Sequence, residues 1–177
     1  MTKLKIGSEA IPFSLPGIDG ANHGLAEYSG KNAVAVIFSC NHCPYVRAWE
    51  YRMVQIQADY ASKDVQLVAI NANDASKYPE DSFSKMKERA HEKHFNFPYL
   101  RDESQEVAHA YGAERTPEVF LFDKTGTLRY HGVIDDNYDD PAAVKVKYLR
   151  DALDAILSGR QPQTAETKPV GCTIKWK

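Results

Sequence analysis

Apolar residues along the chain occur first in short unbroken runs and then at helical spacings, which predicts alternating strands and helices. Residues 33–38, Ala-Val-Ala-Val-Ile-Phe, form a continuous apolar run that is typical of a strand buried on both faces. Between Val46 and Tyr60 the apolar positions lie three and four residues apart, which indicates one face of a helix, and Pro44 suits its first turn. A second run at 65–71 completes a strand–helix–strand unit, which predicts a parallel pair with a right-handed crossover.

The second half of the chain predicts shorter elements. Charged helical spacing covers residues 82–94, and a short helix is expected at 105–111. Two β-rich runs, 118–122 and 127–133, flank an Asp-Lys-Thr-Gly turn and predict an antiparallel hairpin. Pro141 is expected to begin the last helix, because proline is favoured in a first helical turn.

The C-terminal tail, residues 160–177, has no helical period. It ends in Val-Gly-Cys-Thr-Ile-Lys-Trp before the final lysine, which is too apolar for a free end, so we expect the tail to pack back on the domain. No linker or repeat divides the chain. We therefore predict a single domain over residues 1–177.

Composition narrows the classes of function. The 177 residues include 22 basic and 24 acidic side chains, a net charge of −2, which leaves no basic surface for nucleic acid. The N-terminal residues lack an apolar signal region, and no window approaches about 18 consecutive apolar residues. These patterns predict a cytoplasmic protein with neither nucleic-acid nor membrane partners.

Three cysteines carry the chemical signal. An odd number without an export signal favours thiols over structural disulfides. Cys40 and Cys43 form a Cys-Asn-His-Cys motif between a buried strand and a helix, where free N–H groups and the helix dipole favour a thiolate. One cysteine can attack an oxidised substrate while the other resolves the product. His42 can donate a hydrogen bond or present a positive charge to Cys40 and lower its pKa.

Other assignments of the same residues stay open. A metal-binding or metal-delivery protein could use Cys40, Cys43 and a histidine, although His91 and His94, the comparable cluster, suit a solvated helix face. Cys172 is either a third redox thiol or a small buried apolar residue. An arginine can stabilise a thiolate, and the candidates that lie near the motifs are Arg47 and Arg115.

Seven short motifs, spread over nearly the full length, occur in the order of a known fold. They are Phe13-Ser14-Leu15-Pro16-Gly17, Asn41-His42-Cys43-Pro44, Asn71-Ala72-Asn73-Asp74, Phe97-Pro98-Tyr99-Leu100, Tyr111-Gly112-Ala113, Thr116-Pro117 and Gly171-Cys172-Thr173-Ile174-Lys175-Trp176. With the predicted elements, they resemble the thioredoxin fold in its peroxiredoxin-like branch, which is related to the alkyl hydroperoxide reductase and thiol-specific antioxidant group.

The resemblance implies an α/β fold with a central mixed β-sheet flanked by helices, an N-terminal extension, an inserted helix and a C-terminal tail. It implies a cis peptide at Thr116-Pro117 and active cysteines at Cys40 and Cys43, with substrate thiols approaching between them. We expect supporting roles for Asn41, His42, Arg115, Thr116 and Pro117. The implied activity is that of a thiol–disulfide oxidoreductase or antioxidant protein without a bound cofactor. Its partners would be protein or small-molecule disulfides, peroxides and a recycling thiol reductant.

Two departures from the family pattern bear on the reaction. Cys43 aligns with the peroxidatic cysteine of true peroxiredoxins, but Cys40 and Val36 stand where those proteins have Thr or Ser and Pro. A second thiol therefore replaces the hydroxyl that orients peroxide, which argues against a standard peroxidase. The sequence leaves open which of the two thiols attacks.

Overall fold

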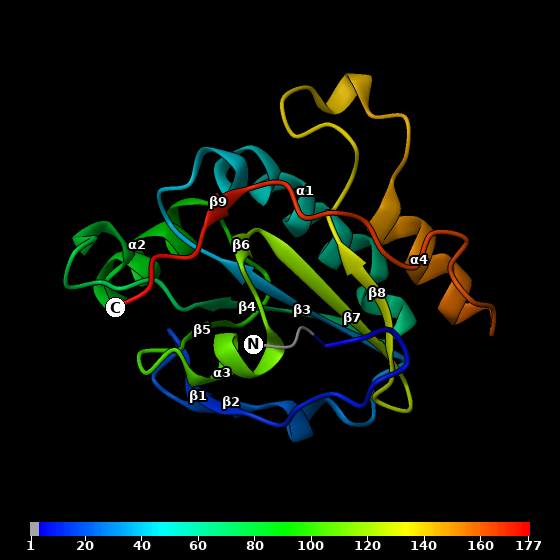
Figure 1. Ribbon diagram of the computed structural model, residues 1–177, viewed down its shortest axis with the longest axis horizontal. Coiled ribbons are helices and arrows are strands. Elements are labelled where there is room, and N and C mark those ends of the chain that lie inside the picture. The colour runs from blue at the N-terminus through cyan, green and yellow to red at the C-terminus, as the bar shows by residue number, and fades with distance from the viewer. Residues whose placement is uncertain (1–3) are drawn as a thin grey trace.

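A five-stranded mixed sheet forms the centre of the computed structural model, which describes residues 4–177 (Figure 1). The strand order is β5-β4-β3-β7-β8. The first three are parallel: β3 (Ala33–Ser39), β4 (Val65–Asn71) and β5 (Tyr99–Arg101). The hairpin strands β7 (Glu118–Asp123) and β8 (Leu128–Gly132) complete the sheet in antiparallel register, as the sequence predicts.

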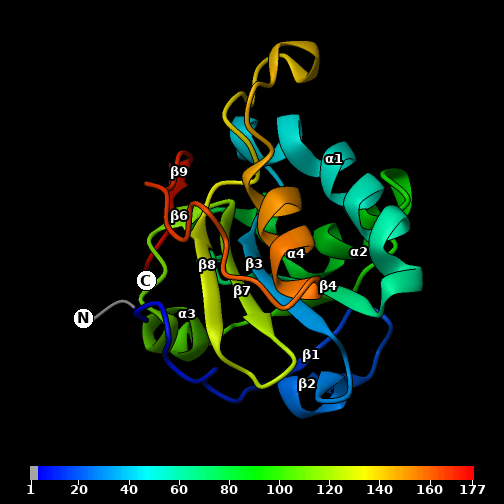
Figure 2. The same cartoon turned by 90° about the vertical axis from the view of Figure 1, so that its right-hand side faces the viewer.

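Helices cover both faces of the sheet (Figure 2). On one face lie α1 (Pro44–Tyr60), α2 (Phe83–Glu92) and α4 (Tyr148–Leu157), and on the other lie α3 (Glu106–Tyr111) and the N-terminal hairpin of β1 (Ser14–Pro16) and β2 (Asn22–Gly24). Short 3-10 turns span Leu25–Tyr28, Ala61–Lys63, Pro79–Asp81 and Pro141–Ala143. The mixed α/β architecture confirms the predicted fold class.

The central strand β3 explains why an unbroken apolar run marks this fold. All seven of its residues are buried, and alternate side chains enter the two cores on opposite faces of the sheet. Ala33, Ala35 and Ile37 pack on the α1 side, and Val34, Val36 and Phe38 pack on the α3 side. Since neither face meets water, the strand is apolar at every position except its last residue, Ser39.

The helix expected from Pro141 begins later than predicted. Asp140 accepts a hydrogen bond from the Ala142 amide and caps a single 3-10 turn, and α4 starts only at Tyr148. The intervening segment is held by the preceding loop instead, because the Lys145 amide donates to the Asp136 carboxylate and the Asp136 amide donates to the Val146 carbonyl. These hydrogen bonds compete with a continuous helix.

The C-terminal tail runs back across the domain. Its strand β9 (Cys172–Thr173) pairs antiparallel with β6 (Arg115–Thr116), and Ile174 is buried in the core on the α3 side. Figures 1 and 2 show β9 beside β6 in both views. The tail therefore brings its cysteine to the segment that precedes Pro117.

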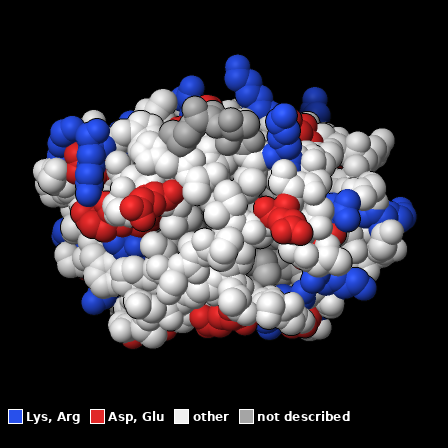
Figure 3. All heavy atoms as spheres, turned by 60° about the horizontal axis from the view of Figure 1, so that its bottom comes forward, with Lys and Arg blue, Asp and Glu red and all other residues white. Residues whose placement is uncertain are grey.

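The described surface carries charges of both signs. Figure 3 shows acidic and basic side chains interspersed over one face, in keeping with the near-neutral net charge. Within residues 4–177, none of the helices is both long and apolar enough to cross a membrane.

Candidate active site

Three cysteines meet around one residue, Thr116. Cys40 follows the end of β3, Cys43 precedes the first residue of α1, and Thr116 lies in β6, joined to Pro117 by a cis peptide bond. The Thr116 hydroxyl lies 3.5 Å from Cys40 Sγ, and Cys43 Sγ lies 3.4 Å from the Thr116 carbonyl, to which it donates when it is protonated. Thr116 also stands opposite Cys172 in the β6–β9 pair. One residue therefore contacts or pairs with all three cysteines.

The dithiol is covered while the third thiol is not. Cys40 and Cys43 have exposed fractions of 2% and 0%, and they form a small apolar cluster with Val46. Cys172 and Tyr45 pack against this cluster and are partly exposed. Cys172 is therefore the most exposed of the three cysteines.

Hydrogen bonding within the cluster favours a thiolate at Cys43. Donation from the Cys40 thiol, the largest cause, lowers the pKa of Cys43 to about 4 in spite of burial, and the Cys172 thiol and the Val46 amide in the first turn of α1 act in the same direction. The pKa of Cys40 is raised, because its proton is shared with Cys43, because it is buried, and because the Asp81 carboxylate is near. The geometry thus favours Cys43 as the nucleophile.

This thiolate should make the stability of the reduced protein depend on pH. A pKa that falls from 9.0 to about 4 on folding stabilises the native state fully above pH 9, and the effect is lost as pH falls through about 4. We expect the free energy of unfolding of the wild type to rise relative to that of Cys43→Ser between about pH 4 and 9. Urea unfolding of both proteins under reducing conditions measures it, and parallel curves would contradict the assignment.

The loop between the cysteines is held by hydrogen bonds that centre on Asn41. The Asn41 amide donates to Asp81 Oδ1 at 2.7 Å, its side-chain amide donates to the Glu80 carbonyl at 2.9 Å, and the Tyr99 hydroxyl donates to Asn41 Oδ1 at 2.7 Å. Arg47 Nε donates to the Asn41 carbonyl at 3.1 Å. Asn41 therefore fixes the loop, and Arg47 supports the same residue.

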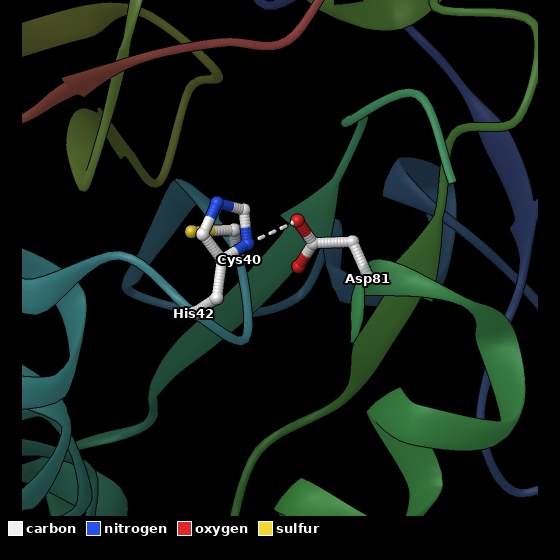
Figure 4. Close-up of side chains that lie close together, drawn as sticks. All are labelled: Cys40, His42 and Asp81. Atoms are coloured by element: carbon white, nitrogen blue, oxygen red, sulfur yellow. Dashed lines mark ion pairs between the residues drawn. The ribbon is translucent and has the colours of Figure 1, made fainter. Parts of the chain in front are cut away.

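His42 faces a carboxylate that the sequence did not associate with it. Its Nδ1 lies 2.6 Å from Asp81 Oδ2, and its ring stacks on Tyr78 with centroids 5.8 Å apart. Figure 4 shows the imidazole directed at Asp81, with the Cys40 sulfur beside the ring. Asp81 thereby orients His42 next to the dithiol.

Asp81 is the main site residue that the sequence did not reveal. It ends the 3-10 turn Pro79–Asp81, is completely buried, and accepts hydrogen bonds from the side chains of Asn71 and Asn73 as well. Asp81 lies in a long polar stretch of the sequence, where neither a hydrophobic period nor a known motif marks it as a site residue. The available hint was the pair Asn71 and Asn73, which lie at and just past the carboxyl end of β4, where α/β sheets form their ligand crevices.

Cys40, His42 and Asp81 are the one group among residues 4–177 whose side-chain atoms lie close enough together to hold a metal ion. Atoms of Cys40, His42 and Asp81 lie within 4.8 Å of one another. The carboxylate is nevertheless occupied by protein donors, and Cys43 is directed at Thr116 instead. His91 and His94 lie exposed at and just beyond the end of α2.

Arg115 lies on the tail side of the site. Its Nη1 donates to the Gly171 carbonyl at 3.3 Å, and its charge acts with that of Lys175 to lower the pKa of Cys172. Burial and the neighbouring Cys43 outweigh both charges and raise that pKa to about 11. The field of Arg115 therefore acts on the third thiol.

Known proteins with similar sequences and structures share this arrangement of elements. The AhpC/TSA family model matches residues 6–131. Thiol-disulfide oxidoreductase ResA of Geobacillus thermodenitrificans is 29% identical over 128 residues, 72% of this chain and 69% of the relative. A crystal structure of an uncharacterized conserved protein from Geobacillus kaustophilus is 42% identical, with a TM-score of 0.93 and coverage of 98% of this chain and 93% of that one. A hypothetical protein from Sinorhizobium meliloti 1021 is 37% identical with the same TM-score, covering 99% and 97%.

Proposed function

This chain belongs to the AhpC/TSA family, and we propose that it is a thiol–disulfide oxidoreductase in which Cys40 and Cys43 form a reversible dithiol. The observation that carries the proposal is the buried Cys40–Cys43 pair at the N-terminus of α1, in which one thiol stabilises the other as a thiolate. The relative named thiol-disulfide oxidoreductase supports the same activity.

The proposed reaction uses each cysteine once. The Cys43 thiolate attacks one sulfur of a substrate disulfide, forms a mixed disulfide and releases the other substrate sulfur as a thiolate, which takes up a proton. Cys40 then loses its proton to the departing group and attacks Cys43 Sγ, which releases the second substrate thiol. The substrate gains two electrons and the protein keeps a Cys40–Cys43 disulfide. An external thiol reductant, a partner of that chemical class, restores the dithiol.

The couple should be more oxidising than that of thioredoxin. A stabilised Cys43 thiolate favours the reduced protein, and a favoured reduced form makes the disulfide easier to reduce. We expect a reduction potential less negative than about −270 mV, at which a cytoplasmic glutathione pool would keep the protein reduced. Equilibration with glutathione buffers, followed by thiol alkylation, measures the potential, and a value near that of thioredoxin would contradict this expectation.

Peroxide reduction is the second candidate, favoured by the low pKa of Cys43. In that reaction the thiolate takes the terminal peroxide oxygen to form a sulfenic acid and an alcohol or water leaves. The Cys40 thiol then displaces water from the sulfenic acid, and the same Cys40–Cys43 disulfide results. The two candidates share a nucleophile and differ only in the oxidised substrate.

One set of variants tests the dithiol and separates these substrates. Wild type, Cys40→Ser, Cys43→Ser and the exposed-site control His91→Ala are each given a small-molecule disulfide or hydrogen peroxide. We expect both cysteine variants to lose turnover with the disulfide, Cys40→Ser to retain one stoichiometric reaction, and His91→Ala to match wild type. Turnover that survives in both cysteine variants would overturn the proposal, and failure of peroxide to react with wild type would remove the second candidate.

A further inference from the structure

We propose that Cys172 is a third redox thiol, which accepts the disulfide from Cys40 and carries it as a Cys43–Cys172 bond to the partly exposed edge of the site. This inference rests on the proposed function, because it starts from the oxidised dithiol. Its basis is the convergence of the three cysteines on Thr116.

The tail is fitted closely to the segment that holds the dithiol. Cys172 pairs with Thr116 across β6 and β9, and Thr116 contacts both Cys40 and Cys43 through its side chain and carbonyl. At Gly171 an added Cβ would lie only 2.1 Å from the Thr116 carbonyl oxygen, so nothing larger than glycine fits this approach. The close backbone contact therefore holds the Cys172 side chain against the buried pair.

Hydrogen bonds on both sides of Cys172 keep the tail in this place. Before it, the Gly171 carbonyl accepts from Arg115, and after it, the Lys175 amide donates to Asn73 Oδ1 at 2.9 Å. The Lys175 carbonyl accepts from the Asp74 amide at 2.8 Å. These contacts link the tail to the loop that supports Asp81, so the third thiol is positioned by the same network as the dithiol.

Burial gives the transfer a purpose. A Cys40–Cys43 disulfide would lie within the buried cluster, so its sulfurs would be less exposed to an external thiol than the sulfur of Cys172. Cys172 is partly exposed and packs against the same cluster. Replacing the Cys40–Cys43 bond by a Cys43–Cys172 bond presents the Cys172 sulfur to the external reductant while Cys40 and Cys43 stay buried.

The charges around Cys172 change with the redox state in the direction that this transfer requires. In the reduced protein, burial and the hydrogen bond that it donates to Cys43 raise the pKa of Cys172. Once Cys43 is bonded to Cys40 it carries no negative charge, and the opposing charges of Lys175 and Arg115 remain. Oxidation of the dithiol therefore increases the thiolate fraction of Cys172, which is the attacking species.

The exchange is balanced within the chain. The Cys172 thiolate attacks Cys43 Sγ, the Cys43–Cys172 bond forms, and the Cys40–Cys43 bond breaks. Cys40 leaves with the electron pair and takes up the proton that Cys172 lost, so the exchange involves no net oxidation. An external dithiol then attacks Cys172 Sγ, releases the Cys43 thiolate and closes on itself, which returns three thiols and an oxidised reductant.

Disulfide mapping tests the proposal. Wild type is oxidised with diamide, quenched with acid, alkylated and digested without reduction, and its linked peptides are identified by mass spectrometry. We expect both Cys40–Cys43 and Cys43–Cys172 linkages in wild type, and Cys43–Cys172 alone in Cys40→Ser. A Cys40–Cys43 linkage with Cys172 always alkylated would overturn this inference and leave the proposed function intact. Absence of any Cys40–Cys43 linkage would instead count against the proposed function.

Rates and a matched pair of glycine variants exclude a merely structural role. Oxidised Cys172→Ser should be reduced by dithiothreitol at least about tenfold more slowly than wild type, because its disulfide stays covered. Gly171→Ala, which retains all three sulfurs, should lose the Cys43–Cys172 linkage but keep Cys40–Cys43. Gly30→Ala, at a glycine whose added Cβ meets nothing within 4 Å, should behave as wild type. Equal reduction rates for wild type and Cys172→Ser would sink the proposal.

Discussion

Replacing Cys43 by serine is expected to remove the thiolate that the protein carries at neutral pH, whereas replacing Cys40 by alanine should keep it and raise its pKa by about 1–2 units. The sign follows from donation by the Cys40 thiol, the largest cause of the low pKa of Cys43. Losing one hydrogen bond to a charged group costs about 1.5–3 kcal/mol, and one pKa unit corresponds to about 1.4 kcal/mol. Turnover should be abolished in the Cys43→Ser variant.

Thiolate absorbance near 240 nm, followed from pH 3 to 8 in the reduced proteins, measures this effect. Cys40→Ser is the matched control, because its hydroxyl can still donate to Cys43, and its midpoint should lie between those of wild type and Cys40→Ala. A thiolate that persists at neutral pH in Cys43→Ser would show that Cys40 is the nucleophile and would reverse the roles assigned here.

Most of the fold could be predicted from the sequence because its central elements are buried on both sides. The strand predicted at 33–38 is β3, and the run at 65–71 coincides with β4, in which every residue except the partly exposed Gln66 is buried. The position of Cys43 at the start of α1 followed from the change of hydrophobic period at Pro44. The hydrophobic pattern was sufficient to predict an element wherever that element is buried in the core.

The parts that sequence could not reveal depend on contacts between segments far apart in the chain. Asp81 meets Asn41 and His42 only because the loop after β4 folds back over the end of β3. The tail was expected to pack on the domain, but its partner strand is the two-residue β6, which is too short to leave a pattern. The place of Cys172 beside Cys43 rests on that pairing, and for this reason both roles of Cys172 stayed open in the sequence.

Asp81 is the point at which the site and the stability of the fold depend on the same side chain. Its carboxylate is fully buried and accepts from the Asn41 amide at 2.7 Å and from Asn73 Nδ2 at 2.9 Å, while His42 Nδ1 lies 2.6 Å away. Removing a buried acceptor leaves each of its donors without a hydrogen-bond partner, because water cannot replace the acceptor, and this lowers the stability of the fold. The hydrogen bonds that would be lost include those that hold the loop between the two active cysteines.

Replacing Asp81 by alanine is expected to lower the free energy of unfolding by about 3–5 kcal/mol, because several buried donors lose their acceptor at about 1–3 kcal/mol each. Urea unfolding measures it. Asp135→Ala is the matched control, since Asp135 is also buried and accepts from Trp49 and Arg52 farther along α1. We expect a comparable loss of stability in the control without a change in thiol reactivity.

The isosteric change Asp81→Asn separates the electrostatic role of this residue from its structural role. The Asp81 carboxylate contributes to the raised pKa of Cys40, so its neutralisation should lower that pKa, because a nearby negative charge opposes thiolate formation. Thiolate absorbance shows the shift in a Cys43→Ser, Cys172→Ser background, where Cys40 is the remaining thiol. With Asp135→Asn in the same background, the Cys40 pKa should stay in place. If both asparagine variants moved it equally, Asp81 would act through the stability of the fold rather than through its charge.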